Sequence, residues 1–183
     1  MGDDYTGPVT VSDEDGNTRV LGDIKVWSQS ETIVEMVKDT DPGDTIPLAS
    51  ANKGGLNKVV EWMEQMAKFK ADSASDEGQT WINDYKATMA SQDQLPLLIS
   101  TMEAANFMIV KDLLDELCKF VADIIAQKTP AEILDHFNIE TDATPEEEQE
   151  LISKYKWIDP EGLIAKDREK RLAESQEAKE DEA

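Results

Sequence analysis

The chain has 183 residues with 18 basic and 40 acidic side chains, which gives a formal net charge of −22 at neutral pH. A field of that sign repels DNA, RNA and anionic membrane surfaces, so we expect no nucleic acid and no membrane among the partners, and proteins instead. With 39% apolar residues the chain can bury one sizeable core.

The chain contains one cysteine, Cys118, and one histidine, His136. These numbers exclude an internal disulfide and a zinc site built from several Cys or His ligands, and we expect no metal and no other cofactor. His136 falls near a predicted helix end, where the helix dipole favours a histidine without any chemistry, and no phosphate loop or nucleophile elbow is present. We therefore expect no catalytic residue and no enzymatic activity.

The start of the chain is acidic and polar, and no stretch approaches the about 18 apolar residues of a membrane span. We expect a protein of the cytoplasm and nucleus.

A small sheet is predicted near the N-terminus. Residues 9–11 and 18–21 form a hairpin around Asp15-Gly16, and residues 45–48 form an edge strand because Pro47 cannot donate to a ladder. The acidic residues of the hairpin turn lack the glycine and the bidentate Glu of an EF-hand loop, which argues against calcium.

Helices account for most of the remaining chain. Apolar spacing predicts helices over residues 30–38 and 52–69, one through Leu95 and Met102 that ends near Ala105, and a central core helix over 110–127. Cys118 lies in the apolar stripe of the central helix, where we expect a buried, unreactive thiol. Residues 70–80 hold few large apolar side chains and are expected to form a mobile acidic loop.

Two helices near the C-terminus begin with the same pattern. Thr129 and Thr144 are each followed by Pro and, three residues on, by Glu, which predicts capping boxes with proline at the first helical position. Tyr155 and Trp157 follow the second of these starts, and from the residues alone they belong either to the core or to an apolar patch that another protein covers. From residue 159 the chain is charged and has no apolar face, so we expect a tail that is either a solvated helix or disordered.

Residues 102–157 also carry a specific run of residues. It includes Ala-Ala-Asn-Phe at 104–107, Lys-Asp-Leu-Leu-Asp at 111–115, Lys-Thr-Pro-Ala-Glu-Ile at 128–133, Phe-Asn-Ile at 137–139, Thr-Pro-Glu-Glu-Glu at 144–148 and Trp157. This run closely resembles the Skp adaptor family, the linkers of SCF (Skp–cullin–F-box) ubiquitin ligases. A looser similarity extends the resemblance to about residues 9–158, and Ala143 and Tyr155-Lys156 depart from the pattern, as in a divergent paralogue.

The resemblance implies an α/β, α-rich fold. Residues 1–127 would form a POZ/BTB-type domain with a three-stranded sheet and packed helices, residues 128–158 would form F-box-binding helices, and residues 159–183 would be a tail. It implies a non-catalytic adaptor in the ubiquitin pathway of protein degradation, which binds a cullin through Asn106 and Phe107. The residues implied for the F-box groove are Leu114, Cys118, Val121, Ile139 and Trp157.

Exposure of that groove predicts that the free protein either self-associates or leaves its last helices mobile. Two alternatives stay open: another POZ-fold module, either elongin-C-like or a homo-oligomer, and an acidic chaperone that mimics nucleic acid. The Thr129 and Thr144 extensions argue against elongin C, which ends near the equivalent of Gln127.

Overall fold

The computed structural model describes residues 5–69, 76–139 and 144–155. By its internal contacts the chain divides into two units, residues 1–120 and 121–183, and the division falls within helix α6. The predicted domain boundary after Gln127 stays a prediction, and the predicted tail lies outside the described residues.

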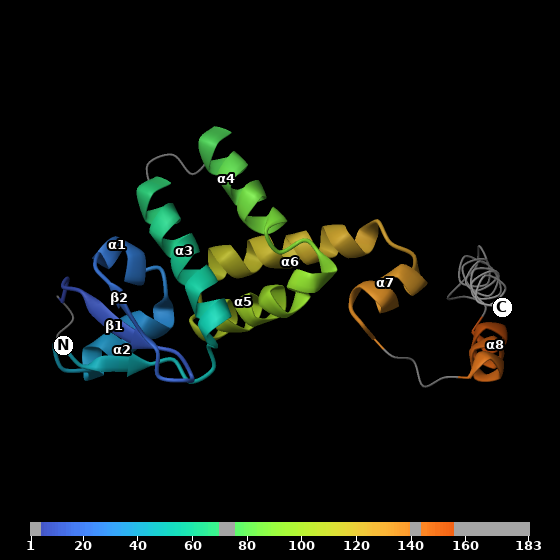
Figure 1. Cartoon of the computed structure of the whole chain (residues 1–183), viewed down its shortest axis with the longest axis horizontal. Helices are drawn as coiled ribbons and strands as arrows, with labels where there is room; N and C mark the ends of the chain where they lie inside the picture. The colour runs from blue at the N-terminus through green and yellow to red at the C-terminus, as the bar shows by residue number, and fades with distance from the viewer. Residues whose placement is uncertain (1–4, 70–75, 140–143, 156–183) are drawn as a thin grey trace, which may run out of the picture. The chain divides into compact units, whose positions relative to one another are not determined.

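A three-stranded mixed sheet with strand order β2-β1-β3 opens the first unit (Figure 1). β1 (Val9–Ser12) pairs antiparallel with β2 (Thr18–Leu21) and parallel with β3 (Thr45–Pro47). Gly16 has a φ of 82°, as the tight hairpin turn requires. Pro47 lies on an edge strand, and Leu48 N–H donates to Ser12 O at 2.8 Å just beyond it. The predicted hairpin and edge strand are confirmed.

Two short helices follow the hairpin. α1 (Ile24–Trp27) is a single turn capped by Asp23, which the apolar pattern did not predict. α2 (Glu31–Asp39) begins where predicted, because the Ser30 side chain accepts a hydrogen bond from Ile33 N–H.

Four further helices follow, and the last of them continues from the first unit into the second. They are α3 (Lys53–Phe69), α4 (Asp76–Ala87), α5 (Leu95–Phe107) and α6 (Lys111–Ala126), with a short 3-10 turn (Gln92–Gln94) before α5. α3 packs along α5 in the body of this unit (Figure 1). Residues 70–75 of the predicted loop lie outside the described residues. Residues 76–80 form the start of α4, so the loop prediction is wrong there.

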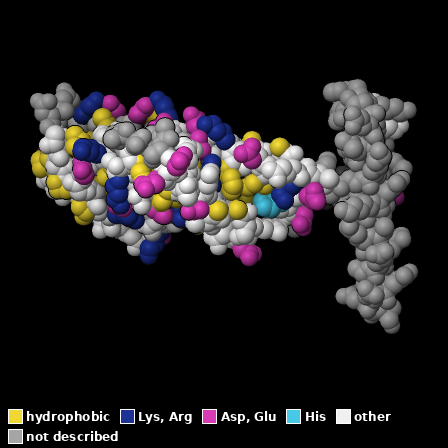
Figure 2. Space-filling model, turned by 90° about the horizontal axis from the view of Figure 1, so that it is seen from above, with side chains coloured by type: hydrophobic (Ala, Val, Ile, Leu, Met, Phe, Trp, Pro, Cys, Tyr) yellow, Lys and Arg dark blue, Asp and Glu magenta, His cyan; other side chains and the backbone are white. Residues whose placement is uncertain are grey.

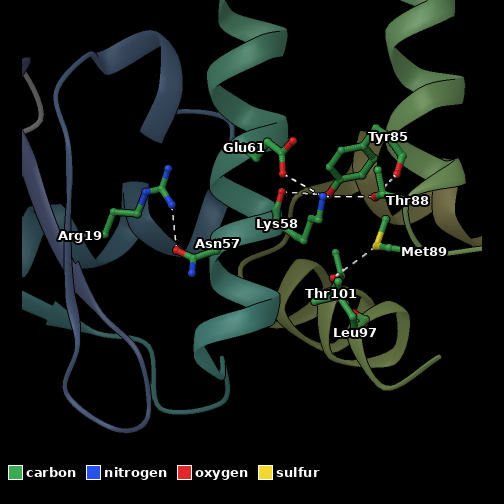
Figure 3. A network of polar contacts seen from close by, with 9 residues as sticks. All are labelled: Arg19, Asn57, Lys58, Glu61, Tyr85, Thr88, Met89, Leu97 and Thr101. Carbon is green, nitrogen blue, oxygen red and sulfur yellow. Dashed lines mark hydrogen bonds and ion pairs between the residues drawn. The ribbon is translucent and has the colours of Figure 1, made fainter. Parts of the chain in front are cut away.

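Contacts between aromatic rings and a polar network around Lys58 link α3 to α4, and Figure 3 shows the polar network. The ring of Trp62 lies 5.8 Å from that of Trp81 and 5.5 Å from that of Tyr85. Lys58 Nζ lies 5.0 Å from the centre of the Tyr85 ring and donates to Glu61 Oε2 at 3.0 Å, and Tyr85 OH donates to Lys58 O at 2.8 Å. Burial raises the pKa of the Tyr85 phenol, so this hydroxyl stays a donor.

The second unit contains the end of α6 together with α7 (Pro130–His136) and α8 (Pro145–Lys154). Both short helices have the predicted capping box: the threonine side chain accepts from the amide three residues on, and the glutamate accepts from the threonine amide. The α-rich fold with a small three-stranded sheet is therefore confirmed.

Candidate protein-interaction surfaces

Asn106 and Phe107, the residues assigned to the cullin, lie on the last turn of α5. They were expected in a connection after a helix ending near Ala105, and this expectation is wrong. Asn106 is exposed and Phe107 is half-buried. The start of α2 holds the turn in place, because Thr32 Oγ1 donates to Phe107 O at 2.7 Å and Ser30 Oγ donates to Met108 O.

Ile109 follows the C-cap residue of α5, Met108, and has a φ of 51°. Ile109 N–H donates to Asn106 O at 3.2 Å, and Val110 N–H donates to Ala105 O at 2.9 Å. This is a Schellman motif, in which the residue after the cap takes the left-handed conformation that Gly or Asn normally supplies. The helix end was placed too early because a β-branched residue gives no sequence signal for this conformation.

Two adjacent hollows open beside Ile109 and share Ser28, Glu31 and Ile109 as lining residues. One is completed by Thr32, Val34, Glu35 and Met36 of α2, and the other by Gln29, Met66, Val110, Lys111 and Asp112. We call the residues that line these two hollows the Ile109 surface. The sequence alone did not predict the Ile109 surface, because its residues come from segments far apart in the chain. Only the adjacent residues Asn106 and Phe107 were singled out from the sequence.

Charges surround the apolar centre of the Ile109 surface. Glu31 and Lys111 form an ion pair across it, and the hydrogen bond that Lys111 donates to Glu31 raises the pKa of the lysine. Both side chains are largely exposed, so the pair adds little to stability. On the face shown in Figure 2, acidic and basic side chains are interspersed.

The residues assigned to the F-box contact are divided between the two units. Leu114 and Cys118 lie one turn apart on α6, and Val121 follows on the same side of that helix. Leu113 and Leu117, on another side, are the buried members of α6. Cys118 is exposed, so the expectation of a buried thiol is wrong: the apolar stripe is wider than the face that the first unit covers.

Ile139 lies in the second unit, directly after α7. Asn138 follows the C-cap residue of that helix and has a φ of 51°, and Ile139 N–H donates to Leu134 O at 2.8 Å. The Ile139 side chain is 53% exposed. Trp157 lies outside the described residues. The assembly of the five residues into one groove stays a prediction, as do the individual assignments.

His136 lies in the last turn of α7, half-buried, with its ring edge-on to Phe137. In the part of the chain that the structure describes, no three His, Cys, Asp or Glu side chains are placed to hold a metal ion. In the acidic hairpin turn, the Asp13 carboxylate accepts hydrogen bonds from the backbone amides of Asp15 and Asn17 at 3.0 and 2.8 Å. None of the described helices combines the length and apolar character needed to cross a bilayer.

Comparison with known proteins gives a consistent set of relatives. Residues 111–158 match the family model described as "Skp1 family, dimerisation domain". The chain is 38% identical over 129 residues to SKP1-like protein 11 of Arabidopsis thaliana, covering 70% of this chain and 82% of the relative. It is 33% identical over 160 residues to the E3 ubiquitin ligase complex SCF subunit sconC of Arthroderma otae, covering 84% and 96%. It is 34% identical over 145 residues to the S-phase kinase-associated protein 1 homolog of Tetrahymena thermophila, covering 75% and 86%.

Proposed function

The chain belongs to the Skp1 family, and we propose from this membership that it is the non-catalytic adaptor of an SCF-type E3 ubiquitin ligase, joining a cullin to F-box substrate receptors. The observation that carries the proposal is the extent of the similarity, because the match to the SCF subunit sconC covers 96% of that protein. The chain therefore matches the relative over both the part proposed to bind the cullin and the part proposed to bind F-box proteins.

The fold agrees with this role. Family membership implies a BTB/POZ fold, and the three-stranded sheet with packed helices in the first unit is of that kind. We place the protein in the cytoplasm and nucleus, and we propose that the free protein self-associates, since Ile139, Leu151 and Tyr155 are all exposed in the second unit.

We assign the cullin contact to the end of α5. Changing Asn106 and Phe107 together to Lys places two charges in a contact that excludes water, where an unpaired charge costs several kcal/mol. The double variant should keep its fold and its F-box binding and lose the cullin in a pull-down from purified components.

The matched control is Ser91→Lys/Gln94→Lys, which adds two lysines at exposed positions before α5. This control should bind the cullin as the natural chain does. Cullin binding by the Asn106/Phe107 double variant equal to that of the control would contradict the assignment.

We assign the F-box contact to Leu114, Cys118, Val121, Ile139 and Trp157. Ile139→Asp should abolish F-box binding with little change in melting temperature, because the side chain is already 53% exposed. Trp157→Ala should weaken binding by about 2 kcal/mol or more, as truncation of an aromatic anchor does.

Leu151→Asp is the control for Ile139→Asp, since Leu151 is equally exposed at 52% and lies outside the assigned set. Equal loss in both aspartate variants, measured by calorimetry with an F-box domain, would contradict the assignment of Ile139.

A further inference from the structure

Ile109 is held in a backbone conformation that disfavours it. Its φ of 51° lies in the left-handed region, where a β-branched side chain crowds the backbone. Such conformations persist where the surrounding structure enforces them, and they gather at functional sites. Here the enforcement comes from the Schellman hydrogen bonds of Ile109 and Val110 and from the bonds that Ser30 and Thr32 donate to the preceding carbonyls.

The isolated chain does not fully bury the isoleucine at this position. The side chain is 40% exposed, so a large part of its apolar surface stays in contact with water. The same turn at the end of α7 is formed by Asn138, which has the same φ of 51° and accepts that conformation readily. The backbone of the α5–α6 turn therefore does not require an isoleucine.

The position of Ile109 indicates what its side chain contacts. Ile109 lines both hollows of the Ile109 surface. The other apolar lining residues are Val34 and Met36 in one hollow and Met66 and Val110 in the other. An exposed apolar side chain between two hollows forms a ridge that fits between side chains of a partner. Two of the charged residues that line the hollows, Glu31 and Lys111, form an ion pair with each other, so covering the ridge leaves neither of these two without its partner.

From this geometry we infer that Ile109 is an apolar anchor of the adaptor–cullin contact and packs between apolar side chains of the cullin. The inference rests on the proposed function and extends the contact from Asn106 and Phe107 across the Ile109 surface. Continuity supports it, because Phe107 and Ile109 belong to one turn whose carbonyls are held by α2. The backbone strain is retained because the isoleucine is needed in the complex and not in the free chain.

The test compares stability with cullin affinity in the full chain. Ile109→Asn relieves the strain, so its melting temperature should rise by about 2–4 °C. The same change should weaken binding of the cullin at least about tenfold in calorimetry, as loss of an anchor does. A merely structural residue would not move these two measurements in opposite directions. Ile109→Val keeps the apolar branched side chain and should bind within about threefold of the natural chain.

Ile99→Asn is the matched control, because Ile99 is 47% exposed on the helical part of α5 and lines neither hollow. It should leave cullin affinity unchanged and should not raise the melting temperature. An Ile109→Asn variant that binds the cullin as tightly as the natural chain, or that melts at a lower temperature, overturns the inference while the proposed function stands. A natural chain that binds no cullin overturns the proposed function, and the inference with it.

Discussion

Gly55 is the residue at which α3 comes closest to α5. A Cβ atom at this position would lie 2.3 Å from Ser100 O and 3.2 Å from Ala104 Cβ, both on α5. No such contact is tolerated with a backbone oxygen, so the two helices would have to move apart. Gly54 and Gly55 lie in the first turn of α3, where glycine is a poor helix former, and the close packing of α3 on α5 explains the glycine at position 55.

We predict that Gly55→Ala lowers the free energy of unfolding by about 1–3 kcal/mol, as overpacking of a close contact does. Gly54→Ala is the control, because its Cβ would meet Leu97 Cδ1 at 3.2 Å, the movable end of a side chain. That substitution should be neutral or stabilise by up to about 1 kcal/mol, since alanine is the better helix former. Urea denaturation of both variants gives the comparison, and equal effects would contradict the role of Gly55.

Among the elements, α4 and α6 are tied by a cluster around Glu116. Lys86 of α4 approaches Glu116 Oε2 at 3.1 Å, and Lys119 of α6 approaches Oε1 at 3.0 Å. The hydrogen bond donated by Lys119, aided by the bond and charge of Lys86, lowers the pKa of Glu116 below its ordinary value of 4.5. A carboxyl with a lowered pKa in the folded state stabilises the fold above its unfolded pKa, and this contribution is lost as the pH falls through the folded value.

We predict that Glu116→Gln destabilises the protein by about 1 kcal/mol at pH 7, the upper range for a partly exposed pair. The difference from the natural chain should be constant above pH 6 and shrink once the pH falls below the ordinary value of 4.5. Chemical denaturation at a series of pH values measures it, with Glu103→Gln on the exposed face of α5 as control. A difference that persists unchanged to pH 2 would contradict this origin.

The elements also differ in how far the sequence predicts them. The caps at Ser30, Thr129 and Thr144 depend on neighbouring residues alone, and all three were predictable. The end of α5 depends on the left-handed conformation of Ile109, a residue type that gives no local signal for it. A hydrogen bond that Thr32 of α2 donates to Phe107 O helps to hold this turn.

The candidate surfaces follow the same rule. Asn106 and Phe107 could be chosen from the resemblance, because it preserves their order and spacing. The exposure of Cys118 could not, because the apolar stripe of α6 does not say which of its sides is covered. The hollows beside Ile109 are formed by segments far apart in the sequence, so they appear only in the folded chain.

At the scale of the whole molecule, the core and the two proposed contacts are unevenly distributed. Every buried hydrophobic residue found in the described parts of the chain lies between Val9 and Leu117, within the first unit. The described large apolar side chains of the second unit, including Ile139 and Leu151, are exposed or half-buried. Folding of the first unit therefore draws its hydrophobic stabilisation from its own residues.

We predict that a chain ending at Gln127, which keeps α6 whole, folds cooperatively and melts within a few degrees of the full chain. Since Asn106, Phe107 and Ile109 remain, it should bind the cullin with unchanged affinity. It should lose F-box binding, because Ile139 and Trp157 are removed, and it should lose self-association for the same reason. Circular dichroism, calorimetry with each partner and sedimentation velocity measure these properties. A truncated chain that fails to unfold cooperatively would show that α7 and α8 complete the core, and one that keeps F-box binding would place that contact on α6 alone.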